Sequence, residues 1–123
     1  MKNIVLDGLN VGEQIFEGGI VKTAVINLSN HSILERTYDV ELYLSSAEDG
    51  SVKNASSGVG TLTVPPNDTI SIQFTLTLPE DEGEYFVFLS VLLEGKRPIT
   101  YKARNKVMIL PPQEVEVSFM QWQ

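Results

Sequence analysis

The sequence predicts an all-β protein, an immunoglobulin-like antiparallel β-sandwich of about seven to nine strands. Apolar and polar residues alternate with a period of two over long segments, most clearly in residues 69–78, "TISIQFTLTL". Turn-forming clusters such as "PPND" and "PEDEGE" separate these segments. No window keeps the helical period of 3.6 residues. Short alternating segments divided by turns favour a sandwich over parallel βαβ units.

Eight segments have the pattern of a strand. They lie at residues 3–7, 20–28, 37–46, 59–64, 69–78, 84–93, 99–110 and 114–120. Within 37–46, "TYDVELYLSS", the residues predicted to face the core alternate with Asp39, Glu41 and Tyr43, which should face outward. The predicted core residues of this strand are Tyr38, Val40, Leu42 and Leu44.

The segment 84–95, "EYFVFLSVLLEG", is apolar on both faces, unlike a strand with one face in water. One explanation is that a loop, such as residues 45–58, covers Phe86 and Phe88. The other is that these two rings form a surface for a partner protein. The sequence leaves both explanations open.

The last twelve residues also permit two interpretations. Residues 112–123 begin at the second residue of the pair Pro111-Pro112 and are either the last edge strand of a single domain spanning 1–123 or the start of a following domain. An edge strand such as "EVEVSFM", residues 114–120, could pair across a twofold axis and form a homodimer.

Composition limits the function. The chain has 123 residues, nine Lys and Arg against sixteen Asp and Glu, and a formal net charge of -7, which disfavours nucleic acid and anionic membrane surfaces. It contains no cysteine, so it has neither a disulfide framework nor a thiolate nucleophile. The beginning of the chain predicts neither a signal peptide nor direct membrane insertion, so we expect the leader or anchor of an exported protein to be missing from it.

No catalytic or metal site is predicted. His31 is the only histidine and sits in the turn "SNHS", where we expect it to be exposed. A triad needs a second group to hold its histidine, and zinc needs three or four ligands that one histidine without cysteine cannot supply. We therefore expect no enzyme activity, no cofactor and no metal.

Five of the nine basic residues cluster late in the chain, and Lys102, Arg104 and Lys106 alternate along the predicted strand 99–110. Such a stripe could bind an anionic partner. Alternatively, its cations oppose acidic residues on neighbouring strands and form an ordinary solvated face.

Four asparagines occupy Asn-x-Ser/Thr triplets, the acceptor pattern for N-linked sugars. They are Asn27, Asn30, Asn54 and Asn67. Either they mark an exported, glycosylated domain, or they reflect the preference of Asn, Ser and Thr for turns. An extracellular or envelope location is the expectation that follows from the first interpretation, with an intracellular scaffold as the alternative.

Residues 19–110 resemble CARDB-type modules, the cell-adhesion-related immunoglobulin-like domains of prokaryotic surface proteins. The resemblance rests on "GGIVKTAVINLSN", "YDVELYLS", the run "GTLTVPPNDTISIQFTLTLPEDEGEYFVFLSV" and the late strand ending in "KVMI". It implies the sandwich fold and no catalytic residues. The same outline is similar to the extracytoplasmic domains of archaellum stator proteins, which bind the surface layer.

These observations together predict a non-catalytic adhesion, scaffold or spacer module of a bacterial or archaeal surface protein. Its partner would be another protein or a neighbouring domain of the same chain. The alternatives are a carbohydrate-binding or accessory domain of an extracellular hydrolase, or an envelope anchor that binds the surface layer. Sugar binding would use solvent-facing aromatic rings. The candidates are Tyr43, Tyr101 and Trp122.

Overall fold

The computed structural model describes residues 4–7, 14–93, 96–103, 106–110 and 122. These residues form ten strands. The strands are β1 (Ile4–Asp7), β2 (Gln14–Glu17), β3 (Val21–Asn30), β4 (Arg36–Ser45), β5 (Ala55–Ser56), β6 (Gly60–Val64), β7 (Thr69–Thr77), β8 (Gly83–Leu93), β9 (Ile99–Lys102) and β10 (Val107–Leu110). Among the residues with a described structure, no helix has the length and apolarity needed to cross a membrane.

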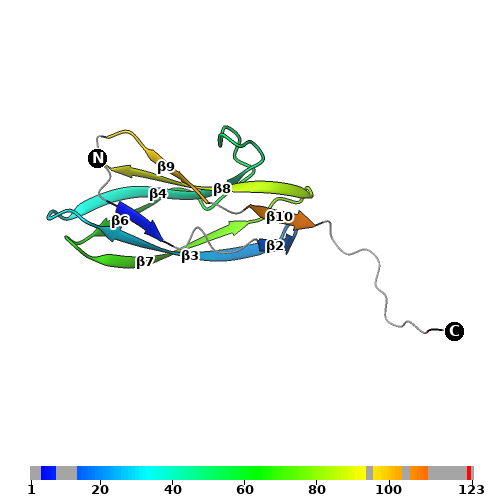
Figure 1. Cartoon of the computed structure of the whole chain (residues 1–123), viewed down its shortest axis with the longest axis horizontal. Helices are drawn as coiled ribbons and strands as arrows, with labels where there is room; N and C mark the ends of the chain where they lie inside the picture. Colours follow the sequence, from blue (N-terminus) through cyan, green and yellow to red (C-terminus); the bar gives the residue numbers. More distant parts are fainter. Residues whose placement is uncertain (1–3, 8–13, 94–95, 104–105, 111–121, 123) are drawn as a thin grey trace.

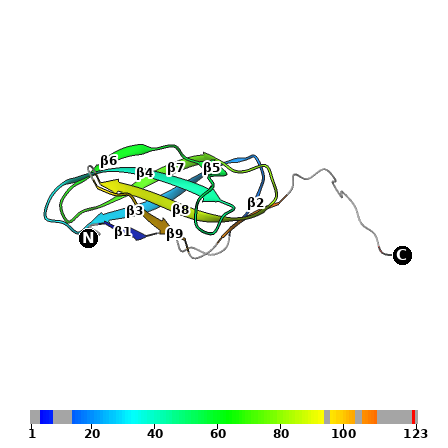
Figure 2. The ribbon, with the colours of Figure 1, turned by 90° about the horizontal axis from the view of Figure 1, so that it is seen from above.

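The strands form two sheets that pack face to face (Figures 1 and 2). The smaller sheet has the order β1-β3-β7, and the larger has the order β2-β10-β8-β4-β5, with β6 also paired to β4 and β9 to β8. Every pairing is antiparallel except that of β2 with β10. The predicted fold class, an all-β immunoglobulin-like sandwich, is confirmed.

Two long ladders form the framework. β3 pairs with β7 from Val21 opposite Thr77 to Ser29 opposite Thr69, and β4 pairs with β8 over a similar length. Their inward side chains form one apolar core between the sheets. Its most completely buried members are Ile26, Leu28, Val40, Val64, Leu89 and Ile109.

Most predicted strands lie within two residues of their observed bounds, but 99–110 is not one strand. Its first part, β9, pairs with Phe88–Val91 of β8, and its second part, β10, pairs with Gly83–Tyr85. The register relative to β8 shifts by two residues between these two pairings, so they do not form one continuous ladder. The short strands β2 and β5 were not predicted, and the predicted strand 114–120 lies outside the described residues.

Candidate interaction surface

The second apolar face of β8 is covered by a loop. Phe88 is only 4% exposed and stacks on Tyr43 of β4, with ring centroids 5.4 Å apart. Gly50 lies directly over this pair, because a Cβ atom there would be 3.0 Å from the Tyr43 hydroxyl and 3.3 Å from Phe88. Of the two explanations for this face, the covering loop therefore applies to Phe88, and the expectation that Tyr43 faces outward into solvent is wrong. Phe86 remains half-buried.

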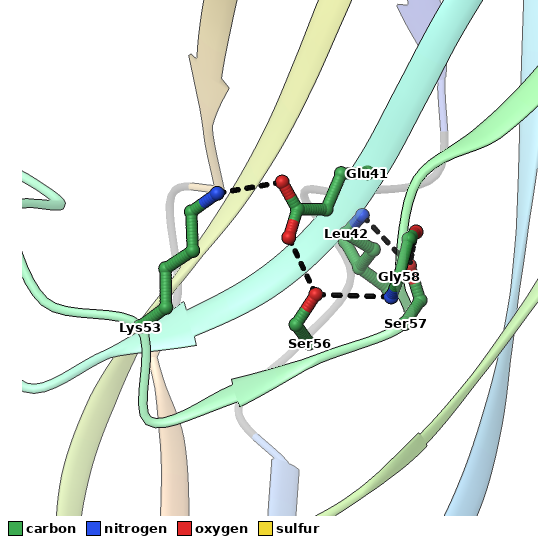
Figure 3. Close-up of polar contacts among 6 residues, drawn as sticks. All are labelled: Glu41, Leu42, Lys53, Ser56, Ser57 and Gly58. Carbon is green, nitrogen blue, oxygen red and sulfur yellow. Dashed lines mark hydrogen bonds and ion pairs between the residues drawn. The ribbon is translucent and has the colours of Figure 1, made fainter.

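Residues 46–54, here called the cover loop, are tied to β4 by polar contacts. Asn54 accepts a hydrogen bond from the Ser46 amide at 2.7 Å, which closes the base of the loop. Lys53 donates to a Glu41 carboxylate oxygen at 2.6 Å, and Ser56, just beyond the loop, donates to the other oxygen at 2.5 Å (Figure 3). These contacts hold the loop over the aromatic pair.

The Glu41 carboxylate is electrostatically stabilised at this position. Burial alone raises its pKa, but hydrogen bonds from Lys53 and Ser56, together with the Lys53 charge, outweigh burial and hold the pKa below its usual value. Glu41 therefore keeps its charge down to a lower pH than an exposed glutamate. The cover loop is therefore held over Tyr43 and Phe88 by contacts to an ionised Glu41 carboxylate.

The predicted basic stripe contacts this region instead of forming a separate surface. The amino groups of Lys102 and Lys106 lie 4.4 and 4.9 Å from the ring centroid of Phe86. Each also faces a carboxylate, Lys102 that of Glu48 at 3.7 Å and Lys106 that of Glu84 at 3.2 Å. Arg104, the third predicted member, lies outside the described residues. The two described lysines are thus compensated in charge and cover an aromatic ring.

The four sequons differ in accessibility. Asn27, Asn54 and Asn67 are exposed, whereas Asn30 is completely buried at the end of β3. Asn27 lies within β3 rather than in a turn, and its side chain accepts a hydrogen bond from Ser71 at 2.6 Å. His31, which follows the buried asparagine, is exposed as expected.

Asn30 organises the turn that follows β3. Its Nδ2 donates to the carbonyl oxygens of Leu34, Val64 and Pro65 at 2.9, 3.1 and 3.3 Å, and its Oδ1 accepts from the Ser32 amide at 2.9 Å. One side chain thereby links two turns at the same end of the sandwich. This sequon has a structural role in the fold.

A surface that we did not predict covers the outward positions of β3 and β7. Side chains at opposite positions in an antiparallel ladder share a face, and here none of them is charged. We call them the neutral strip: Val21, Thr23, Val25, Asn27 and Ser29 on β3, with Thr69, Ser71, Gln73, Thr75 and Thr77 on β7. All except Ser29 are exposed.

The neutral strip is ordered by its own hydrogen bonds. The hydroxyls of Thr23 and Thr75 lie 3.1 Å apart, and those of Ser29 and Thr69 lie 2.7 Å apart. Val21 and Val25 add apolar area, with 62% and 55% of their surface exposed. On the larger sheet, β4 and β9 place the charged residues Asp39, Glu41 and Lys102 at outward positions, and on the smaller sheet Asp7 of β1 has the register position beside the strip, opposite Asn27. The sequence shows that residues 69–78 contain no charge, but it does not show that this segment pairs with β3, whose outward residues are also uncharged.

The residues considered for other chemistry do not come together. Within the described ranges, no three His, Asp or Glu side chains gather closely enough to hold a metal ion. Of the aromatic residues proposed for sugar stacking, Tyr43 is buried, Tyr101 is half-buried and only Trp122 is fully exposed. The carbohydrate-binding alternative thus loses Tyr43 as a stacking platform.

Comparisons with known proteins identify the fold but no family. No family model matches the chain, and no curated protein matches it by sequence.

Several solved structures share its fold at low sequence identity. A FixG-related protein from Vibrio parahaemolyticus superimposes with a TM-score of 0.62 at 11% identity, covering 89% of this chain and 98% of the other. The PapD-like domain 7 of human CEP192 gives 0.59 at 12% identity, covering 90% and 87%. The CARDB domain of the PF1109 protein from Pyrococcus furiosus gives 0.57 at 13% identity, covering 89% and 93%. At these identities the similarity establishes the immunoglobulin-like sandwich alone.

Proposed function

We propose that this chain is a non-catalytic, CARDB-like module that acts through protein–protein contacts, as an adhesion, scaffold or spacer element of a prokaryotic surface or envelope protein. The neutral strip carries the proposal. The centres of protein interfaces are depleted of charged residues, and the strip has that composition on a chain whose net charge is -7. The similarity of the whole fold to PapD-like and CARDB domains also supports a module of this kind.

The neutral strip is also pre-organised, because its backbone and several side chains are already held in place. Continuous pairing of β3 with β7 fixes the backbone, and hydroxyl contacts such as that between Thr23 and Thr75 restrict the side chains. A surface that is already ordered loses little conformational entropy when a partner docks. Uncharged side chains also avoid the cost of removing ions from water.

A photo-crosslinking residue at position 25 tests this proposal in the native host. We expect Val25, in the middle of the strip, to give one discrete protein adduct that Thr23→Glu abolishes. The matched control places the same cross-linker at Thr63, an exposed position on β6 of the larger sheet. Equal adducts from both positions, or none from position 25, would contradict the proposal.

The proposed location outside the cytoplasm has a separate test. Asn27, Asn54 and Asn67 are exposed acceptors, whereas the amide of Asn30 is occupied by backbone carbonyls. A glycopeptide mass spectrum of protein from its own source should show sugars at exposed sites and an unmodified Asn30. Unmodified peptides at all four sites, from a host that glycosylates its exported proteins, would contradict this location.

A further inference from the structure

β7 is an edge strand with an unusual composition. It pairs with β3 on one side and, within the described part of the chain, with no strand on the other. Its nine residues, "TISIQFTLT", contain no charge, proline or glycine. Natural edge strands are commonly protected from pairing by lysine, proline, bulges or shortness, and β7 shows none of these features. By comparison, the edge strand β6 has five residues and begins with Gly60.

The hydrogen-bond phase shows which backbone groups of β7 face the open edge. The backbone amide of Asn30 donates to the Asp68 carbonyl at 2.8 Å, and the backbone amide of Leu78 donates to the Ile20 carbonyl at 2.8 Å. At both ends of the ladder, the residue that bonds to the β3 side is therefore even-numbered, Asp68 at one end and Leu78 at the other. Bonded pairs alternate along an antiparallel ladder. The even-numbered residues of β7 therefore bond to β3. The N–H and C=O groups of Ser71, Gln73, Thr75 and Thr77 point away from it.

We propose that this open edge pairs with β7 of a second copy of the chain, antiparallel and across a twofold axis at Gln73. The inference rests on the proposed function, because β7 forms half of the neutral strip and this pairing would join the strips of two copies into one continuous uncharged face. Gln73 is the midpoint of β7, so this register pairs the full length of both strands. It would place Gln73 opposite itself, Ser71 opposite Thr75 and Thr69 opposite Thr77.

Two physical features favour a second copy as the occupant. Two chains that each carry a net charge of -7 repel one another in general, so a surface without charge, such as β7, is where this repulsion opposes contact least. The twofold register also matches hydroxyl with hydroxyl on the outward face, a favourable cross-strand combination. The result would be a continuous six-stranded sheet, β1-β3-β7-β7-β3-β1, in place of two three-stranded sheets.

Charge substitutions at the axis test the register. Gln73→Lys puts two cations directly opposite each other, so we expect it to raise the dimer dissociation constant at least about tenfold. The same substitution makes the net charge of each chain less negative, which by itself would weaken the repulsion between chains and strengthen the dimer. A weaker dimer would therefore report the two facing lysines and not the net charge. A mixture of the Gln73→Lys and Gln73→Glu variants should recover association, because opposite charges then face each other.

Sedimentation of the full chain over a wide concentration range gives the readout. A wild-type dimer that weakens in each Gln73 variant, recovers in the mixture and survives the control Thr63→Lys supports the inference. A wild-type chain that stays monomeric, a dimer unaffected at Gln73, or a mixture that fails to recover overturns it. A monomer that still gives the discrete adduct from position 25 overturns only the dimer. The proposed function falls if that adduct is also absent.

Discussion

Replacing Asn30 with alanine removes the side chain that joins the two turns at one end of the sandwich. The change leaves the buried Val64 carbonyl without its donor and the half-buried Ser32 amide without its acceptor. An unsatisfied buried group costs about 1–3 kcal/mol and a partly exposed one less, so we expect a total loss of about 2–4 kcal/mol.

This loss is large enough to measure by thermal unfolding. A chain of 123 residues unfolds with an entropy of about 0.26 kcal/mol/K, so the melting temperature should fall by about 8–15 °C. The matched control is Asn27→Ala, which removes an exposed side chain of the same type and should change stability by no more than about 0.5 kcal/mol.

The variant Asn30→Asp separates the roles of the two side-chain atoms. It keeps an acceptor for the Ser32 amide but directs a carboxylate at three carbonyl oxygens. We expect it to destabilise at neutral pH at least as much as alanine, and less at acidic pH, where a protonated carboxyl can donate. Equal melting temperatures for Asn30→Ala and Asn27→Ala would refute the reasoning.

Three further predictions concern the cover loop. Gly50→Ala should cost about 1 kcal/mol more than Gly58→Ala in urea unfolding, because both have positive φ but only the first meets neighbours within 4 Å. Lys53→Met should lower stability by up to about 1 kcal/mol at neutral pH. The pKa of Glu41 is lowered in the folded state, so its ion pair with Lys53 stabilises the fold above the unfolded-state pKa of Glu41 and is lost as the pH falls through the folded-state pKa. Unfolding measured against pH should therefore show the stability difference between wild type and Lys53→Met vanish in acid. Phe88→Ala should cost about 3–5 kcal/mol in calorimetry and leave association unchanged.

The periodicity of the sequence was enough to predict the fold class and the long strands. In 69–78 every second residue is apolar, and the same residues line the core from Phe74 to Leu78. The pattern failed where one element covers another. Tyr43 occupies an outward position, and the cover loop, which joins β4 to β5, folds back over it and removes it from water.

Register explains the other differences. The alternation of Lys102, Arg104 and Lys106 predicted one continuous strand, but the two-residue shift between β9 and β10 depends on their pairing with β8. Similarly, the triplet at Asn30 has the same local sequence as an exposed sequon, and its burial arises from carbonyls more than thirty residues away. The neutral strip required knowledge that β3 and β7 are neighbours. Long-range pairing carries this information, and local composition does not.

Residue-resolved amide hydrogen exchange of the wild-type chain, at low and high protein concentration, tests the central claim most directly. The account predicts that the amides of Ser71, Gln73 and Thr75 exchange rapidly in dilute solution and become protected as concentration rises. The amides of Phe74 and Leu76, bonded to β3, should be protected throughout. Rapid exchange of the three edge amides at every concentration would contradict pairing through β7.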